Sequence, residues 1–417
     1  MKKSICLFFV FVFLGSYSRE QSRFITEKPE KEGLSSEWSD LIKPLMQQYI
    51  DQHKLPGLIT MVARHGKIVE FSKYGMMGPD KTMQFNTIFR IASMTKPITT
   101  VAVMMLYEEG RIRLDDPVSK YIPEFKDLKV FSSTGKDGIH VEKAIRPMTI
   151  SDLLSHTSGL SGGWGDSPVD SMYRAANLSD GTLKDMIKKL SGIPLLYQPG
   201  TRWNYSRSTD VLSYLVEVVS GMPLDQFFRN RIFIPLKMED TEYYVPTEKL
   251  KRVAEVYCPD DSTGIKMIKP DTGDITKPVK FISGNGGLYS TASDYMIFAQ
   301  MLLNQGEYKG VRILQPNTVK LMATNRISED MKPQDDFFGP LLAGMGFGYG
   351  FAIVKDPAKS VIHASKGSLW WSGTANTYFV IDPKEDMILI LMTQFVPNFY
   401  YPVFREFGER VYQALRK

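Results

Sequence analysis

Ser93 and Lys96 lie three residues apart in the stretch 89–97, whose sequence is FRIASMTKP. Side chains three positions apart on a helix share a face, so the serine hydroxyl and the lysine amine would be in contact. A free serine hydroxyl is a weak nucleophile, and a lysine whose pKa is lowered by partial burial can take its proton during attack on a carbonyl carbon. The pair therefore predicts acyl transfer through a serine nucleophile.

Sequence context separates this pair from a second match to the same spacing, Ser133 and Lys136. The second pair falls in the polar, glycine-containing stretch 132–138, which predicts a surface loop. The first pair follows an apolar stretch and opens a segment with apolar residues at helical spacing: Ile98, Val101, Met105 and Leu106. On spacing alone, one alternative stays open, in which Ser93 caps a helix and Lys96 is an ordinary solvated side chain.

The elements that would position Ser93 come from both ends of the chain. A helix is predicted from about Ser36, and the stretches 57–64 and 67–74, joined by His65-Gly66, predict a hairpin. Strand patterns return late in the chain, and a helix with one apolar face follows them. The late strands are 349–354, 376–381 and 386–394, and the apolar face of the last helix carries Phe404, Phe407, Val411 and Leu415.

The middle of the chain, 111–275, is predicted to be mostly helical. One helix begins at Thr149, where Thr149 and Asp152 have the spacing of a capping box. Others cover 180–190 and 208–220. We therefore predict an α+β fold, in which an antiparallel sheet flanked by helices (36–110 plus 276–417) carries this inserted, mostly helical region.

The N-terminus has the pattern of an export signal. Lys2 and Lys3 precede the apolar run 5–14, and small residues follow it, which predicts a signal peptide over residues 1–18 and a periplasmic or secreted protein. The run is too short to span a bilayer, so no stable membrane insertion is expected after cleavage, although an uncleaved anchor is the alternative. Residues 19–35 are charged and predict a flexible leader.

Composition excludes several classes of function. Loss of residues 1–18 would remove two of the 51 basic residues and none of the 46 acidic ones, so the net charge would fall from +5 to +3. That balance gives no indication of nucleic-acid binding. Cys258 would be the one cysteine left, and the five histidines form no recognised zinc motif, so we expect no disulfide within the chain, no metal site and no cofactor. The oligomeric state stays open.

Several stretches together resemble the serine β-lactamase-like family, which contains class C β-lactamases, family VIII carboxylesterases and D-amino-acid-specific peptidases. The resemblance covers residues 36–415, and the joint occurrence of the stretches in order is far more specific than any one of them. They are 91–96 (IASMTK), 153–160 (LLSHTSGL), 200–206 (GTRWNYS), 235–241 (PLKMEDT) and 286–291 (GGLYST).

The resemblance implies roles for individual residues. Ser93 would be the acylated nucleophile, Lys96 its proton partner, and Tyr205 a proton relay between the nucleophile and the leaving group. Nearby ammonium groups would favour the phenolate form of Tyr205. The oxyanion hole would be formed by the backbone N–H groups of Ser93 and Thr374.

Two departures from the β-lactamase pattern affect the choice of substrate. The lactamases carry Tyr-x-Asn where this chain has Tyr205-Ser206-Arg207, and Lys-Thr-Gly where it has Trp371-Ser372-Gly373. The missing lysine removes a charge partner for the carboxylate that β-lactams and D-Ala-D-Ala peptides present. The tryptophan is similar to the third motif of the family VIII esterases. Arg207, Trp371, Ser372 and Gly373 are therefore the predicted substrate-binding residues, and Trp370 and Trp371 would wall an apolar acyl pocket.

A competing motif predicts a different hydrolase. Residues 159–163 fit Gly-x-Ser-x-Gly, with Ser161 in the middle and His363 downstream, as in an α/β-hydrolase. That motif needs a strand before the serine, whereas the preceding segment is predicted to be helical. His156 and Ser158 are expected to brace the loop by hydrogen bonds.

The sequence thus predicts an exported serine hydrolase acting on a small acyl substrate, most simply a carboxylesterase for short acyl esters. One alternative is a class C-like β-lactamase or a D-alanyl-D-alanine carboxypeptidase. Another is a non-catalytic module that binds penicillin-like ligands in the same cleft.

Overall fold

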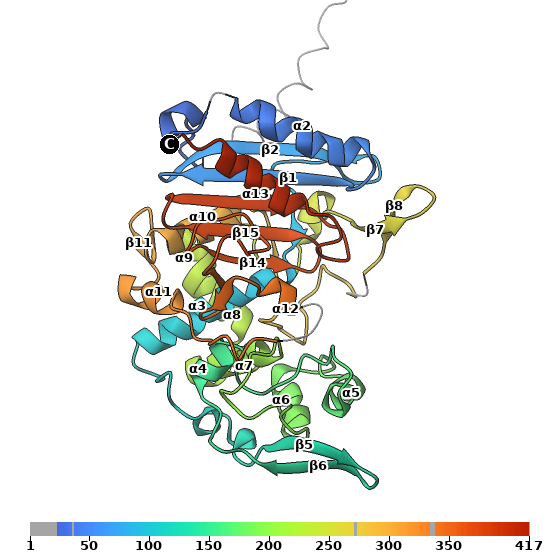
Figure 1. Ribbon diagram of the computed structural model, residues 1–417, viewed down its shortest axis with the longest axis vertical. Coiled ribbons are helices and arrows are strands. Elements are labelled where there is room, and N and C mark those ends of the chain that lie inside the picture. The colour runs from blue at the N-terminus through green and yellow to red at the C-terminus, as the bar shows by residue number, and fades with distance from the viewer. Residues whose placement is uncertain (1–22, 36, 271–272, 334–337, 417) are drawn as a thin grey trace, which may run out of the picture.

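The protein is described by a computed structural model that covers residues 23–35, 37–270, 273–333 and 338–416. Its centre is an eight-stranded antiparallel sheet in the order β12-β13-β14-β15-β16-β1-β2-β3. These strands are Met345–Phe347, Ala352–Val354, Leu369–Gly373, Thr377–Asp382, Met387–Met392, Gly57–Arg64, Lys67–Gly78 and Lys81–Thr82. Figure 1 shows the late strands in red beside the early strands in blue. The predicted α+β class is confirmed.

The early and late parts of the chain meet where β1 pairs with β16. Ile59 lies opposite Met392, and the register continues to Arg64 opposite Met387. On its other edge β1 pairs with β2, and the turn between them is His65-Gly66, as the sequence predicts. The residues of β1 are buried up to Ala63, because helices cover both faces of the sheet.

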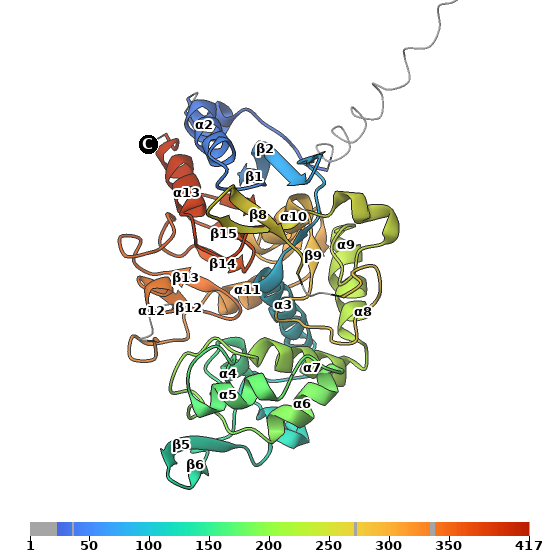
Figure 2. The same ribbon diagram turned by 90° about the vertical axis from the view of Figure 1, so that its right-hand side faces the viewer.

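Two helices cover one face of the sheet and a third covers the other (Figure 2). Helix α2 (Trp38–Asp51) packs beside α13 (Val403–Gln413), and α2 buries Trp38, Ile42, Met46 and Tyr49. On the opposite face α10 (Ala292–Leu303) packs against β15, β16 and β1. Helix α3 (Thr95–Glu108), which carries Lys96, lies between the sheet and the helical region.

The helical region contains α4 (Ile150–Leu154), α5 (Pro168–Ala175), α6 (Leu183–Ser191) and α7 (Ser208–Ser220). The capping box of Thr149 and Asp152 is present, and α7 has the predicted bounds. Not all of 111–275 is helical. Strands β5 (Lys129–Gly135) and β6 (Gly138–Lys143) form an exposed hairpin, so Ser133 is on a strand and not in a loop. Strands β7 (Val256–Asp260) and β8 (Gly264–Ile268) form a second hairpin.

The described part of the predicted flexible leader, residues 23–35, is packed against the sheet, so that prediction is wrong for these residues. Arg23 forms an ion pair with the buried Asp294 of α10, with Nη2 to Oδ1 at 2.7 Å. Thr26 bridges to Ile68 of β2, and Leu34 is fully buried. The charged composition predicted flexibility, but the few apolar and ionic groups of this segment have partners in the folded protein. The predicted signal peptide lies outside the described residues.

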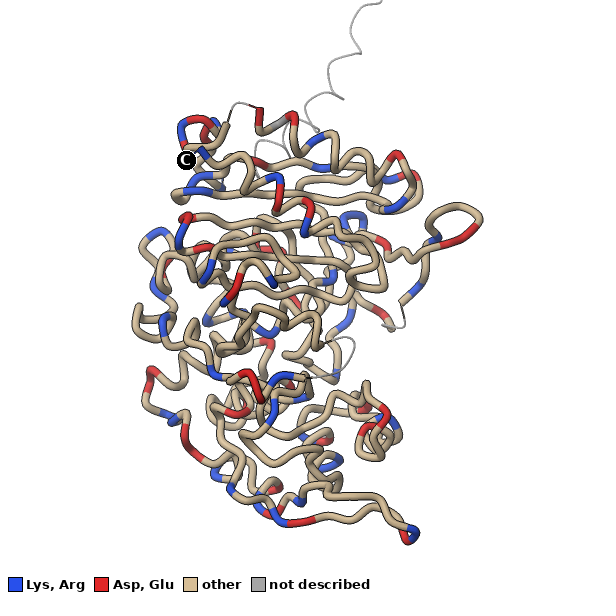
Figure 3. Tube along the Cα trace, in the orientation of Figure 1, with Lys and Arg blue, Asp and Glu red and all other residues tan. Residues whose placement is uncertain are grey.

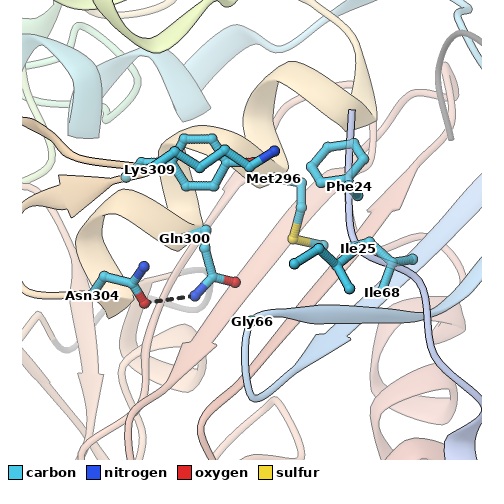
Figure 4. Close-up of a pocket in the computed structure, with 9 residues that line it drawn as sticks. Phe24, Ile25, Gly66, Ile68, Met296, Gln300, Asn304 and Lys309 are labelled. Atoms are coloured by element: carbon cyan, nitrogen blue, oxygen red, sulfur yellow. Dashed lines mark hydrogen bonds between the residues drawn. The ribbon is translucent and has the colours of Figure 1, made fainter. Parts of the chain in front are cut away.

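A cavity lies beneath this segment on the α10 face of the sheet (Figure 4). Phe24 and Ile25 form one side of it, and Met296 of α10 lies beside them. Gln300 donates a hydrogen bond to Asn304 at the same cavity, with the two atoms 2.8 Å apart.

Charged residues of both signs are interspersed along the chain (Figure 3). Within the described ranges, no helix combines the length and the apolar composition needed to cross a membrane.

Glu70 of β2 gives a test of the fold. Its carboxylate is buried and accepts a hydrogen bond from Thr60 at 2.8 Å, and burial raises its pKa to about 7. The folded protein therefore holds the proton of the Glu70 carboxyl more tightly than the unfolded chain does. The stabilisation of the fold that this gives is fully present below about pH 4.5 and is lost as the pH rises through about 7. Glu70→Gln should raise the free energy of unfolding at pH 8 by up to about 3 kcal/mol and change it little near pH 4.5.

Urea unfolding at the two pH values measures this difference. The exposed Glu248→Gln is the matched control and should show no such pH-dependent gain. An equal effect of Glu70→Gln at both pH values would contradict the buried-carboxyl assignment.

Candidate active site

Ser93 lies in a short turn between strand and helix. Strand β4 (Phe89–Arg90) leads into a 3₁₀ turn, Ala92–Met94, and α3 begins at Thr95. Ala92 has a φ of 43°, in the left-handed region that side-chain-bearing residues seldom occupy. Such strain persists where the surroundings impose it, and it is concentrated at functional sites. The turn leaves Ser93 partly exposed at the start of a buried helix.

Lys96 contacts Ser93 as the spacing predicts. Its Nζ donates to Ser93 Oγ at 3.0 Å and to the backbone carbonyl of Asn285 at 2.7 Å. The side chain is 2% exposed, and this burial holds the pKa of the amine well below its usual range. The Asp210 carboxylate opposes the shift and the Arg207 guanidinium adds to it. A neutral amine within hydrogen-bond distance of a serine hydroxyl can act as its general base.

Tyr205 completes the cluster. Its ring lies 4.5 Å from Lys96 Nζ, and its hydroxyl accepts a hydrogen bond from the indole N–H of Trp371 at 3.1 Å. Burial raises the pKa of the Tyr205 phenol, and its hydrogen bonds with Ser93 and Trp371 offset only part of this rise. The predicted preference for phenolate is therefore wrong for the resting site, because burial disfavours both the phenolate and the ammonium that would support it. We call Ser93, Lys96, Tyr205 and Trp371 the Ser93 cluster.

A buried carboxylate holds the backbone that receives Lys96. Asp210 of α7 is fully buried, and its Oδ1 accepts from the Ser283 hydroxyl at 2.7 Å and from the Asn285 N–H at 3.1 Å. Its Oδ2 accepts from Arg207 Nη1 at 3.2 Å. Arg207 is thus paired with Asp210 at the edge of the site, which reduces its capacity to bind a substrate carboxylate.

Strand β14 brings the third motif to the nucleophile. A Cβ on Gly373 would lie 2.5 Å from the Ile91 carbonyl oxygen, so only glycine allows this strand end to approach the backbone that precedes Ser93. Thr374 follows in the turn, and its N–H has no acceptor among the described residues. The end of β14 thus lies beside the backbone that leads into Ser93, and the oxyanion hole of the Ser93 and Thr374 N–H groups stays a prediction.

Side chains of β14 alternate between the two faces of the strand, which places the predicted substrate-binding residues on different sides. Trp371 contacts Tyr205, whereas the Ser372 hydroxyl accepts a hydrogen bond from Asn398 at 3.0 Å. Neighbouring residues of a strand point to opposite faces, so Ser372 and Trp370 point away from the Ser93 cluster. The ring of Trp370 packs toward Phe399, with the centroids 6.5 Å apart. Neither residue therefore fits the substrate-binding role expected of it.

The competing Gly-x-Ser-x-Gly motif does not form a hydrolase site. Ser161 is fully buried and donates a hydrogen bond to Asp170, and its motif follows a helix and not a strand. His363 instead packs against Tyr412 of α13. The bracing predicted for His156 and Ser158 is confirmed: His156 Nδ1 lies 3.3 Å from the Ser206 hydroxyl, and Ser158 Oγ lies 2.7 Å from Ser208 Oγ.

Comparison with known proteins agrees with this geometry. The family model described as Beta-lactamase matches residues 39–403. The chain belongs to the Beta-lactamase family. It is similar to Protein Rv1367c of Mycobacterium tuberculosis, with 35% identity over 359 residues that cover 85% of this chain and 89% of the relative. The resemblance predicted from the motifs is thereby confirmed.

Two further relatives carry descriptions of activity. Esterase EstB of Burkholderia gladioli is 27% identical over 374 residues, covering 84% of this chain and 88% of the relative. The solved structure of EstCE1, described as a hydrolase with promiscuous acyltransferase activity, superimposes with a TM-score of 0.75 at 26% identity and covers 90% of this chain and 98% of that chain. This member of the Beta-lactamase family is accordingly a serine hydrolase.

Three residues at the site were missed by the sequence analysis. Asn285 accepts a hydrogen bond from Lys96, 189 residues away, and Asp210 accepts one from Asn285, 75 residues away, so no local pattern reveals these contacts. Trp164 lies against Tyr205, with the ring centroids 5.4 Å apart. Its one sequence signal is a large aromatic residue between Gly163 and Gly165 in an otherwise small, polar loop.

The indole N–H of Trp371 should contribute to turnover. Trp371→Phe keeps an aromatic ring but removes the donor to Tyr205, so the phenol loses a partner that supports its negative charge during proton transfer. A lost hydrogen bond of about 1.4 kcal/mol in the transition state corresponds to about a tenfold fall in kcat/KM. Trp370→Phe is the matched control, because the buried indole N–H of Trp370 has no hydrogen-bond partner among the residues that the structure describes. Equal effects of the two substitutions would show that the donor does not matter.

Proposed function

We propose that the protein is a carboxylesterase that cleaves short acyl esters through an acyl-enzyme on Ser93. The observation that carries the proposal is the hydrogen bond from Trp371 to Tyr205, because an uncharged indole occupies the place of the lysine in the β-lactamase motif. An ester substrate has no carboxylate that would require this lysine. The printed descriptions of EstB and EstCE1 support the same substrate class.

The proposed reaction uses the Ser93 cluster in two steps. The neutral Lys96 amine takes the proton of Ser93 Oγ as the oxygen attacks the ester carbon, and the N–H groups of Ser93 and Thr374 bind the resulting oxyanion. The proton passes by way of Lys96 and the Tyr205 hydroxyl to the leaving alkoxide, which departs as an alcohol. A water molecule then attacks the acyl carbon and gives a proton to the same pair, which passes it to Ser93 Oγ as the bond between the acyl carbon and Oγ breaks, so that the carboxylic acid leaves and Ser93 is restored.

Turnover of p-nitrophenyl butyrate and of nitrocefin by the same purified protein tests this choice. We expect rapid ester turnover and at most slow nitrocefin turnover. Fast nitrocefin turnover without ester turnover would overturn the proposal in favour of a β-lactamase. Release of D-alanine from a D-Ala-D-Ala peptide, again without ester turnover, would favour the carboxypeptidase alternative. No labelling of Ser93 by a fluorophosphonate would indicate a non-catalytic module.

We also propose that the protein is exported. The support is the basic start, the apolar run and the small residues within residues 1–18. N-terminal sequencing of protein recovered from the periplasm or the medium of an expressing bacterial host should give a start near residue 19. Recovery only from the cytoplasm, with the N-terminus intact, would contradict export.

A further inference from the structure

The exposed side chain of Trp164 lies directly beside the Ser93 cluster. The protein has five tryptophans, and the other four are at most 4% exposed whereas Trp164 is 57% exposed. Its ring stacks on that of Tyr205, with an interplanar angle of 23°. Ligand sites are lined mainly by apolar and aromatic side chains near a few polar groups, and Trp164 has this position beside the Ser93 cluster.

The loop that carries Trp164 is held in place. Arg174 of α5 donates from Nη1 to the carbonyl oxygens of Gly163 and Gly165, at 2.8 and 2.7 Å, so both neighbours of the tryptophan are fixed. The Gly163 N–H donates to the Ser161 hydroxyl at 2.8 Å. A Cβ on Gly162 would lie 2.1 Å from the Trp164 ring, so this glycine allows the ring to lie over its own loop. The loop therefore holds the Trp164 side chain in a defined position.

The surroundings favour a flat, uncharged partner. The rings of Phe338 and Trp371 also contact the ring of Tyr205, with ring centroids 5.3 Å apart in each case, so the groups near Trp164 are aromatic. The Arg207 guanidinium is paired with Asp210, so this ion pair leaves little net charge to attract a charged ligand of either sign. Flat rings stack on an indole more favourably than puckered rings of similar size.

We propose that Trp164 is a specificity-determining residue, which stacks on a flat, uncharged ring in the acyl or alcohol part of the substrate. The inference rests on the proposed esterase function and extends it from short acyl esters in general to esters that carry an aromatic ring. Such a ring would lie against the exposed part of the Trp164 ring while the ester carbon lies at Ser93.

Matched esters that differ only in the flatness of one ring test the proposal. Benzyl acetate and cyclohexylmethyl acetate differ on the alcohol side, and ethyl phenylacetate and ethyl cyclohexylacetate differ on the acyl side. A methylene group separates the ring from the ester in each, so their intrinsic reactivities are similar. For one of the two pairs we expect kcat/KM to favour the flat ring by roughly two- to tenfold.

Substitutions assign this preference to the tryptophan. Trp164→Leu should reduce the flat-to-puckered ratio to about one, and Trp164→Phe should retain part of it. Tyr400→Leu removes another exposed aromatic ring, 52% exposed, and is the control that should keep the full ratio. A ratio near one for both pairs in the unsubstituted protein would overturn the inference. So would a ratio that persists in Trp164→Leu.

Binding without turnover separates this inference from the proposed function. In the Ser93→Ala protein, calorimetric titration should show tighter binding of the flat member of the preferred pair, and Trp164→Leu added to it should abolish the difference. If the unsubstituted protein hydrolyses no ester, the proposed function fails, and the titration still decides the stacking role. Equal binding of flat and puckered esters of both pairs would overturn that role.

Discussion

Ser93→Ala should lower kcat/KM for p-nitrophenyl butyrate by about four to six orders of magnitude, because alanine has no oxygen that can form the acyl-enzyme. Ser93 is partly exposed at the start of α3, so removal of its hydroxyl leaves the packing of the helix intact. Unfolding of the variant should therefore stay cooperative, with a near-ultraviolet spectrum like that of the parent.

The chain contains its own control for this experiment. Ser133 has the same spacing to a lysine but lies on the exposed hairpin strand β5. Ser133→Ala should retain full activity. If Ser93→Ala kept more than about one hundredth of the parent activity, Ser93 could not be the nucleophile.

Lys96→Met should lower kcat/KM by about three to four orders of magnitude, because methionine fills a similar volume but cannot accept the Ser93 proton. In the parent protein burial lowers the pKa of Lys96, which favours the neutral amine that acts as the base. The parent kcat/KM should therefore rise with pH through the pKa of Lys96, and this acidic limb should be absent from the residual activity of the variant. Lys136→Met is the control and should retain both activity and pH profile.

The same substitution should change stability in the opposite direction. A lysine whose pKa is lower in the folded protein than in the unfolded chain opposes folding more as the pH falls from about 10.5 through the folded value. Lys96→Met should thus unfold at higher urea concentration than the parent, and the gain should grow toward acidic pH. Lost activity together with lowered stability would instead indicate that the variant is damaged.

Local signals account for the parts of the fold that could be predicted. The hairpin of β1 and β2, the capping box of Thr149 and the bounds of α7 follow from turn residues, side-chain caps and apolar periodicity, which act within a few residues. The packing of residues 23–35 could not be predicted in this way. It depends on Asp294, more than 250 residues away, and burial of that carboxylate gives Arg23 a partner that composition does not reveal.

The features of the candidate site likewise separate into those set by local spacing and those set by long-range packing. Contact between Ser93 and Lys96 is a property of one helical turn, so spacing predicts it. The protonation preference of Tyr205 depends on how deeply its ring is buried, and the link from Asp210 to the backbone that receives Lys96 depends on the loop at 283–285. Alternation places Trp370 and Trp371 on opposite faces of a strand, but only the assembled sheet shows which face meets the nucleophile.

The pairing of β1 with β16 has a consequence for how the chain reaches its native state. Until residues 387–392 are synthesised and in place, the hairpin of β1 and β2 has one edge of unpaired N–H and C=O groups. More than 300 residues must be made before that edge is covered, so folding depends on a contact of very long sequence separation and should be slow. Nascent or truncated chains that lack β16 should therefore aggregate through this edge or require a chaperone to shield it.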